Sequence, residues 1–202
     1  MFGIETDIIG KIAGIVALAA FVPYIYSTLK GKTKPNRATW WIWTLVSFII
    51  AGSYFDVGAR ETIWVAISYI VGPVIMAILS LKYGEGGWNK FDRFCVLGAL
   101  AGFVLWILFD APLIALLLTI FIDFVGFLPT YKKAYHNPWG ESKLAWIIFV
   151  AADLLNVFAI ETLAFGIVIY PVYMLIVEAP VLFLLFRKRK KNLRKNTSYK
   201  RL

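Results

Sequence analysis

Three acidic side chains lie inside long apolar stretches of this sequence. Asp123, Asp153 and Glu178 occur in the segments IFIDFVG, VAADLLN and LIVEAPV. A charged side chain in the centre of a bilayer is energetically costly and usually faces a polar interior. No Lys or Arg lies within these three stretches to pair with the carboxyl groups. Each group is therefore expected to be protonated at neutral pH or to pair with a cationic ligand or coupling ion. We predict that all three residues act in proton coupling.

Polar and aromatic side chains accompany these carboxyl groups. Asp153 and Asn156 are three residues apart, so a helix places them on one face. Aromatic faces suit a ring or a cation, while polar groups fix the orientation of a ligand. The predicted substrate-binding residues are Asp153, Asn156, Glu178, Trp64, Tyr69, Tyr170 and Tyr173.

A structural interpretation of the same residue types stays open. Asp153 and Asn156 can instead form hydrogen bonds between neighbouring helices. Tyr and Trp also gather in belts at membrane interfaces, and the positions of Trp40, Trp41 and Trp43 predict such a belt.

The elements that must position these residues are membrane-spanning helices. The chain has 202 residues, of which 60% are hydrophobic and 16% charged, too apolar for one soluble core. Its apolar runs of roughly 18 to 24 residues are long enough to cross about 30 Å of hydrocarbon. We predict an all-α integral membrane protein with seven transmembrane helices, at 7–29, 39–55, 61–81, 91–109, 111–131, 144–160 and 163–186.

The distribution of basic residues predicts the orientation of these helices. Lys and Arg gather in the loops after the first, third and fifth spans and in the C-terminal segment. Such loops mark the cytoplasmic side, so we expect the N-terminus outside and the C-terminus in the cytoplasm, with the chain in the cell membrane if its source is prokaryotic. The net charge of +9 comes from the segment 187–201, which holds nine of the 21 basic residues. This basic tail predicts contact with anionic lipid heads rather than with nucleic acid.

Two stretches of the chain, 21–43 and 127–149, share one pattern at a constant offset. Pro23 pairs with Pro129 and Trp40 with Trp146, and both differences are 106. A duplication of this length indicates two parallel repeats of three helices each. Three crossings leave the chain on the other side of the membrane, so one extra helix must bring it back before the second repeat begins. The predicted units are repeat one at 1–83, a linker helix at 84–110, repeat two at 111–186 and the basic tail at 187–202.

The prolines and the basic residues after them carry a family resemblance. Pro23 is followed by Lys30, Lys32 and Lys34, and Pro129 by Lys132 and Lys133. With the 3+1+3 plan, this pattern resembles the PQ-loop superfamily, which includes the SWEET (MtN3) sugar transporters. Tyr24 and Thr130 stand where the Pro-Gln dipeptide of that superfamily has its glutamine. The resemblance implies that Pro23 and Pro129 act as hinges for gate movement.

The function expected from these features is transport. We predict an alternating-access carrier for a small polar solute, such as a sugar, an amino acid or a vitamin-like molecule, with a proton as the candidate coupling ion. Nicotinamide-riboside carriers share the 3+1+3 plan. The alternative is a seven-helix receptor that senses or sorts a ligand without moving it. The sequence leaves open whether the chain forms a homo-oligomer.

Other classes lack the residues that they need. With one cysteine, Cys95, and one histidine, His136, the sequence predicts no metal site and no cofactor. A nucleophile–base pair is missing as well, so we do not expect an enzyme. A retinal protein needs a lysine in mid-membrane, and the last span, 163–186, contains none.

Overall fold

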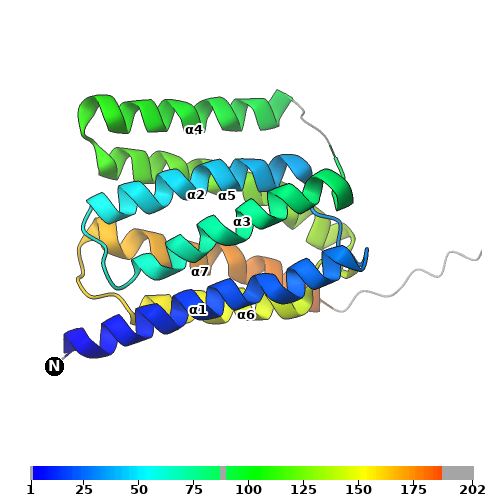
Figure 1. Cartoon of the computed structure of the whole chain (residues 1–202), viewed down its shortest axis with the longest axis horizontal. Coiled ribbons are helices and arrows are strands. Elements are labelled where there is room, and N and C mark those ends of the chain that lie inside the picture. The colour runs from blue at the N-terminus through cyan, green and yellow to red at the C-terminus, as the bar shows by residue number, and fades with distance from the viewer. Residues whose placement is uncertain (1, 87–89, 188–202) are drawn as a thin grey trace, which may run out of the picture.

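The computed structural model describes residues 2–86 and 90–187, and this part of the chain is helical (Figure 1). It contains seven α-helices, one short 3₁₀ turn at Pro138–Gly140 and no β-strand. The predicted basic tail lies outside the described residues, apart from Arg187. The fold class predicted from the sequence is therefore confirmed as all-helical.

The helices follow the predicted apolar runs closely. The second was expected at 39–55 and occupies Arg37–Asp56. The full set is α1 (Phe2–Leu29), α2 (Arg37–Asp56), α3 (Ile63–Tyr83), α4 (Lys90–Phe109), α5 (Pro112–His136), α6 (Lys143–Phe158) and α7 (Phe165–Phe186).

Five of the described helices, α1, α2, α3, α5 and α7, are long and apolar enough to cross a membrane. The sixth helix, α6, has only 16 residues. At about 1.5 Å per residue it spans about 24 Å, less than the roughly 30 Å of a bilayer core.

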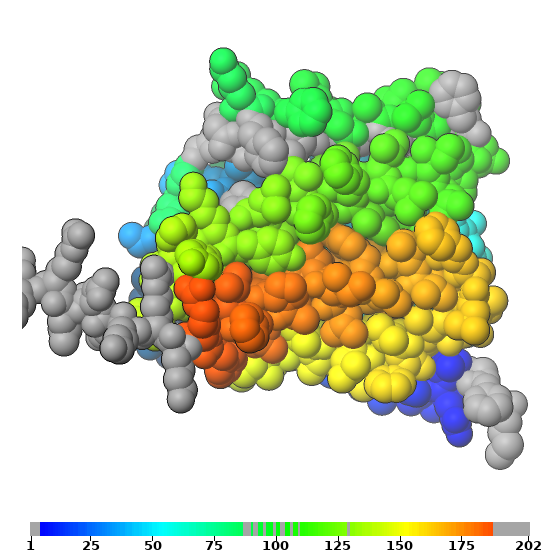
Figure 2. All heavy atoms as spheres, turned by 180° about the vertical axis from the view of Figure 1, so that it is seen from behind, coloured from blue at the N-terminus to red at the C-terminus, as the bar shows by residue number. Residues whose placement is uncertain are grey.

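The helices run side by side in two rows. In the row facing the viewer of Figure 1, α3 lies between α1 and α2. In the row seen from behind in Figure 2, α7 lies between α5 and α6. Across the two rows α1 packs against α6 and α2 against α5, while α4 lies at the edge against α5 and α2. The interior therefore lies between two sets of three helices.

Matching caps begin α2 and α6. The Asn36 side chain accepts a hydrogen bond from the backbone N–H of Thr39 at 3.1 Å. Ser142 Oγ accepts one from the N–H of Ala145 at 3.5 Å. Each cap satisfies an N–H group that the first helical turn leaves without a partner. Asn36 and Ser142 are also 142 − 36 = 106 residues apart, the offset found in the sequence.

Small residues let α1 approach α3 closely. Gly10 and Gly14 form a GxxxG pattern on the face of α1 that contacts the start of α3. A Cβ atom on Gly14 would lie 2.7 Å from Cβ of Trp64, and one on Gly10 would overlap the carbonyl of Glu61. Ser68 Oγ donates to Gly14 O at 2.7 Å and fixes the contact. Helices in lipid associate through such small residues, because lipid gives no hydrophobic driving force between them.

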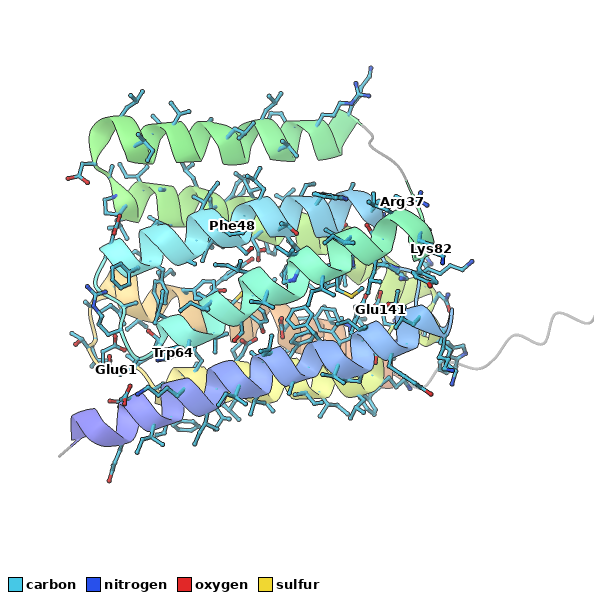
Figure 3. All side chains as sticks on the ribbon, in the orientation of Figure 1. Arg37, Phe48, Glu61, Trp64, Lys82 and Glu141 are labelled. Atoms are coloured by element: carbon cyan, nitrogen blue, oxygen red, sulfur yellow. The ribbon has the colours of Figure 1, made fainter. Side chains whose placement is uncertain are left out.

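The two ends of the bundle differ. Figure 3 places Arg37, Lys82 and Glu141 at one end, called here the basic end, and Glu61 at the opposite end. At the basic end Arg37 Nε donates to Ser80 O at 3.0 Å, which joins the start of α2 to the last turn of α3.

Candidate functional site

A cavity of about 60 Å³ lies inside the bundle and reaches from its middle toward the basic end. All six helices of the two rows contribute side chains to it, and no described residue of α4 does. The lining residues are Phe21, Tyr24, Trp40, Trp43, Ser47, Ile50, Tyr69, Pro73, Asp123, Phe127, Trp146, Phe149, Tyr170, Met174 and Glu178.

Nine of these 15 lining residues are aromatic, and three pairs of them obey the offset of 106. The pairs are Phe21 with Phe127, Trp40 with Trp146, and Trp43 with Phe149. Rings from the two rows pack directly, with centroids 4.8 Å apart both for Phe21 with Phe149 and for Trp43 with Phe127. Equivalent positions of the two predicted repeats therefore line the same cavity.

The interfacial belt predicted for Trp40, Trp41 and Trp43 is wrong for two of them. Trp40 is 5% exposed, and both Trp40 and Trp43 line the cavity. Only Trp41, which is 37% exposed, faces outward. The cause is the helical period, which turns positions three apart on α2 to the same inner side and the position between them away.

The centre of the site holds two carboxyl groups around one phenol. The hydroxyl of Tyr69 on α3 lies 3.2 Å from Asp153 Oδ1 on α6 and 3.3 Å from Glu178 Oε1 on α7. Asp153 and Glu178 therefore share this one hydroxyl group. All three side chains are buried. One phenol proton serves one acceptor at a time, so the cluster has more acceptors than donors.

Several buried polar atoms near this cluster have no hydrogen-bond partner among the described residues. They are Asp153 Oδ2, Glu178 Oε2, both side-chain polar atoms of Asn156, and Trp43 Nε1. Buried polar atoms in native proteins are nearly always paired, so each such group requires an explanation. A proton or a bound solute at the cluster supplies one for the two carboxyl oxygens.

Asp123 approaches the same cavity from α5. Its Oδ2 accepts a hydrogen bond of 2.7 Å from the Tyr173 hydroxyl on α7. Asp123 lines the cavity, whereas Tyr173 does not and instead borders an outer groove between α5 and α7. Asp123 therefore adds a second carboxyl group to the wall.

The structure brings most of the predicted site residues together. Tyr69, Tyr170, Glu178 and Asp123 line the cavity. Asp153 is fully buried behind the wall and touches the cluster through Tyr69. Asn156, also fully buried, lies one turn further along α6.

Trp64 and the two predicted hinges lie elsewhere. Trp64 is the second residue of α3, near the opposite end, and is 38% exposed (Figure 3). Pro23 is half-buried inside α1, one residue from the cavity-lining Tyr24. Pro129 lies within the bounds of α5, two residues after Phe127.

Glu141 closes the cavity toward the basic end. One of its oxygens, Oε2, accepts hydrogen bonds from the Tyr24 hydroxyl at 2.9 Å and from Trp146 Nε1 at 3.3 Å. Lys133 Nζ lies 2.9 Å from the other oxygen, Oε1, and donates to the carbonyl of Lys34 at 2.7 Å. Beyond the Tyr24 and Trp146 rings lies a second cavity of about 120 Å³, the basic-end vestibule. Four side chains line both cavities and lie between them: Tyr24, Trp40, Trp43 and Trp146.

Glu141 was not among the predicted site residues, although a signal was present. It is the only acidic residue between Asp123 and Asp153, in a loop that is otherwise basic, and it is 8% exposed. Its partner Tyr24 is far away in the chain and precedes it by 117 residues.

A second set of contacts closes the opposite end. The hydroxyl of Tyr54 on α2 donates to the carbonyl of Ile167 on α7 at 2.6 Å and lies 2.7 Å from the hydroxyl of Thr62. Glu161, in the loop before α7, accepts hydrogen bonds from the backbone N–H groups of Arg60 at 2.8 Å and Glu61 at 3.4 Å. These contacts join the loop 57–62 to the segment 159–167.

The same end contains a pair of neighbouring carboxyl groups. The pKa of Glu61 is raised above its usual value of 4.5, first because partial burial disfavours the charged form. The negative charge of Glu161 and a hydrogen bond to it raise this pKa further. A proton on Glu61 therefore favours the closed contact between the two loops.

In comparisons with known proteins, no family model and no curated sequence matches the chain.

The chemistry of the site therefore rests on its own residues. No group of three or more His, Cys, Asp or Glu side chains within the described ranges is arranged to hold a metal ion. The cavity offers carboxyl oxygens, phenol hydroxyls and aromatic faces. Such a wall can hold a proton or a small solute that donates hydrogen bonds.

Proposed function

We propose that the protein is an alternating-access carrier in a membrane, which moves a small polar solute through the central cavity. The chain crosses the bilayer seven times, with α4 and the short α6 completing the five longer spans. Its N-terminus is outside and its basic end is cytoplasmic. A short span such as α6 is accommodated by local thinning of the bilayer, at a modest energetic cost.

The neighbour relations of the helices support two parallel repeats. In two parallel repeats, α1 corresponds to α5 and α2 corresponds to α6. The contact between α1 and α6 then corresponds to the contact between α5 and α2, and both contacts exist. The same exchange leaves α3 and α7 each in the middle of a row. The helix α4 stays outside both rows and is the linker of a 3+1+3 plan.

The single observation that carries the proposal is a cavity that both rows line and that contacts between the rows close at both ends. At the basic end Tyr24 of α1 bonds to Glu141, which precedes α6. At the opposite end Tyr54 of α2 bonds to the backbone of α7. A carrier needs gates of this kind on both sides of its site, which open in turn as the halves move against each other.

Prolines inside α1 and α5 are candidate bending points for the helices that move with the gates. A proline inside a helix removes one backbone hydrogen bond and weakens the helix at that turn. Pro23 precedes the gate residue Tyr24 directly, and Pro129 is its counterpart at the offset of 106. We place the hinges of the basic-end gate at these two residues.

Purified protein in liposomes tests the proposal. Uptake of radiolabelled sugars, amino acids, amines, nucleosides and vitamins is measured with protein-free liposomes as the reference. Saturable uptake of at least one solute, lost in Glu178→Gln, is the expected result. A solute that binds to the detergent-purified protein but is never taken up would instead support the ligand-sensing receptor.

A further inference from the structure

The charges of the cavity wall select the class of solute. Asp123 and Glu178 supply two carboxyl groups, and none of the 15 lining residues is Lys, Arg or His. A solute that carries its own carboxylate or phosphate therefore finds no cationic partner in this wall. Moving such a group out of water without a partner is strongly unfavourable.

Unpaired acceptors indicate what the solute must donate. Glu178 is 4% exposed, lines the cavity, and its Oε2 has no hydrogen-bond partner within the described structure. Asp153 Oδ2, directly behind it, is unpaired as well. The Tyr69 hydroxyl is the only described donor to these two carboxyl groups, and a protonated amine supplies up to three more.

The aromatic side chains of the cavity wall also favour a positively charged solute. Rings of Phe21, Phe149 and Tyr69 pack edge-on and tilted around one another, with centroids 4.8 to 6.2 Å apart. The face of an aromatic ring attracts a cation within about 6 Å, most strongly where water is excluded. A neutral sugar would instead need several hydrogen-bonding groups, and most of this wall is aromatic carbon.

The size of the cavity limits the solute. Its volume of about 60 Å³ corresponds to about four to six water molecules, at roughly 10–15 Å³ for each. The closed site therefore accepts a solute of only a few non-hydrogen atoms.

We propose that the transported solute is a small organic ammonium ion, a primary or methylated amine held between Glu178, Asp123 and the aromatic wall. This inference rests on the proposed carrier function and names its substrate class. An amino alcohol such as ethanolamine combines the ammonium group with a carbon skeleton short enough for a cavity of about 60 Å³. Ethanolamine is accordingly the probe.

The test compares ethanolamine with two molecules of similar size. 1-Propanol replaces its ammonium group by a methyl group, and glycine replaces its hydroxymethyl group by a carboxylate. Binding to the detergent-purified protein is measured by calorimetry at constant pH. We expect ethanolamine to bind and the other two not to bind. Glu178→Gln should weaken ethanolamine binding by about tenfold or more, whereas the exposed Glu5→Gln should leave it unchanged.

Other results would overturn the inference. Equal binding of 1-propanol, binding of glycine, or ethanolamine binding that Glu178→Gln leaves intact would each contradict it. If Glu178→Gln fails to fold, Asp123→Asn on the other side of the cavity takes its place with the same expectation.

A flux measurement separates this inference from the proposed function. Ethanolamine that binds but does not cross proteoliposomes would leave the ligand class standing and contradict the carrier. Saturable uptake of a neutral solute, without any ethanolamine binding, would support the proposed carrier function and contradict the proposed substrate class.

Discussion

The hydroxyl oxygen of Tyr69 lies 3.3 Å from Oε1 of Glu178, and this contact joins α3 of one row to α7 of the other in the centre of the bundle. The same hydroxyl reaches Asp153 on α6. One phenol thus links the middle helix of the first row to two helices of the second. Its loss should affect both the stability of the bundle and the state of the carboxyl pair.

Tyr69→Phe tests this link. The substitution keeps the ring and removes the only described hydrogen-bond donor of two buried carboxyl groups. We expect it to lower the free energy of unfolding by about 1–3 kcal/mol, measured by thermal unfolding in detergent. The matched control is Tyr26→Phe, because the Tyr26 ring is 60% exposed on α1 and lies away from the cavity. An equal, small effect of both substitutions would show that the central contact contributes nothing.

A double-mutant cycle on Lys133 and Glu141 tests the closure of the basic end. Lys133 is 20% exposed and the Glu141 side chain 3%, so solvent screens this ion pair only weakly. We expect Lys133→Gln and Glu141→Gln to be non-additive, with a coupling of about 1–3 kcal/mol. The control cycle uses the ion pair of Lys11 and Asp7, whose side chains are 49% and 41% exposed, and should give less than about 1 kcal/mol. Equal coupling in the two cycles would argue against a gate at Glu141.

The neighbouring carboxyl groups Glu61 and Glu161 predict a dependence of stability on pH. Because the pKa of Glu61 is raised above 4.5 in the native state, the native state binds more protons than the unfolded state, most of all between the two pKa values. Stability should therefore be highest at the acidic side and fall as the pH rises through the raised pKa. Glu61→Gln should flatten this decline when unfolding temperatures are compared between about pH 4 and about pH 7. An unchanged slope in Glu61→Gln, with Glu5→Gln as the reference, would contradict this assignment.

The close contact between α1 and α3 predicts that a large side chain at Gly14 strongly destabilises the protein. Gly14→Leu places a side chain where Trp64 already lies, so it should separate the two helices and cost about 1–3 kcal/mol or more. Ile15→Leu is the control, because Ile15 is the next residue and is 68% exposed on the outer face. Thermal unfolding of both variants measures the difference. If Gly14→Leu is as stable as its control, the close approach of the helices is not required.

The apolar runs carry enough information to predict the helices. Long apolar stretches between basic loops fix where helices begin and end to within a few residues, as the bounds of α2 show. Two bounds differ by five residues, the start of α1 and the end of α5. The helix α5 was expected to end at Tyr131 and continues to His136. Its last turn is basic and amphipathic, with Lys133 facing Glu141. Hydropathy does not detect a polar turn of this kind.

The site could be predicted only in part. Asp123 and Glu178 were visible because charge is rare in apolar stretches. Trp40 was not assigned to the cavity, since its place near a loop is equally typical of an interfacial belt. Glu141 stood out only as an acidic residue in a basic loop, and Tyr54 gave no local signal, because the contacts that make them gate residues reach distant parts of the chain. Contacts between the two rows are the information that a single sequence lacks.

Access to Ser47 from the two sides of the membrane tests the central claim most directly. Ser47 lines the cavity, is 7% exposed, and its hydroxyl bonds only to the carbonyl of Thr44 among the described contacts. Ser47→Cys, in a Cys95→Ala background, is treated in proteoliposomes with a small thiol reagent that does not cross lipid, added on either side.

An alternating-access carrier predicts slow labelling from both sides. Adding Glu141→Gln should increase the labelling of Ser47→Cys from the basic end and decrease it from the opposite end, because one gate closes as the other opens. Labelling from one side only, or an increase from both sides at once, would contradict the account.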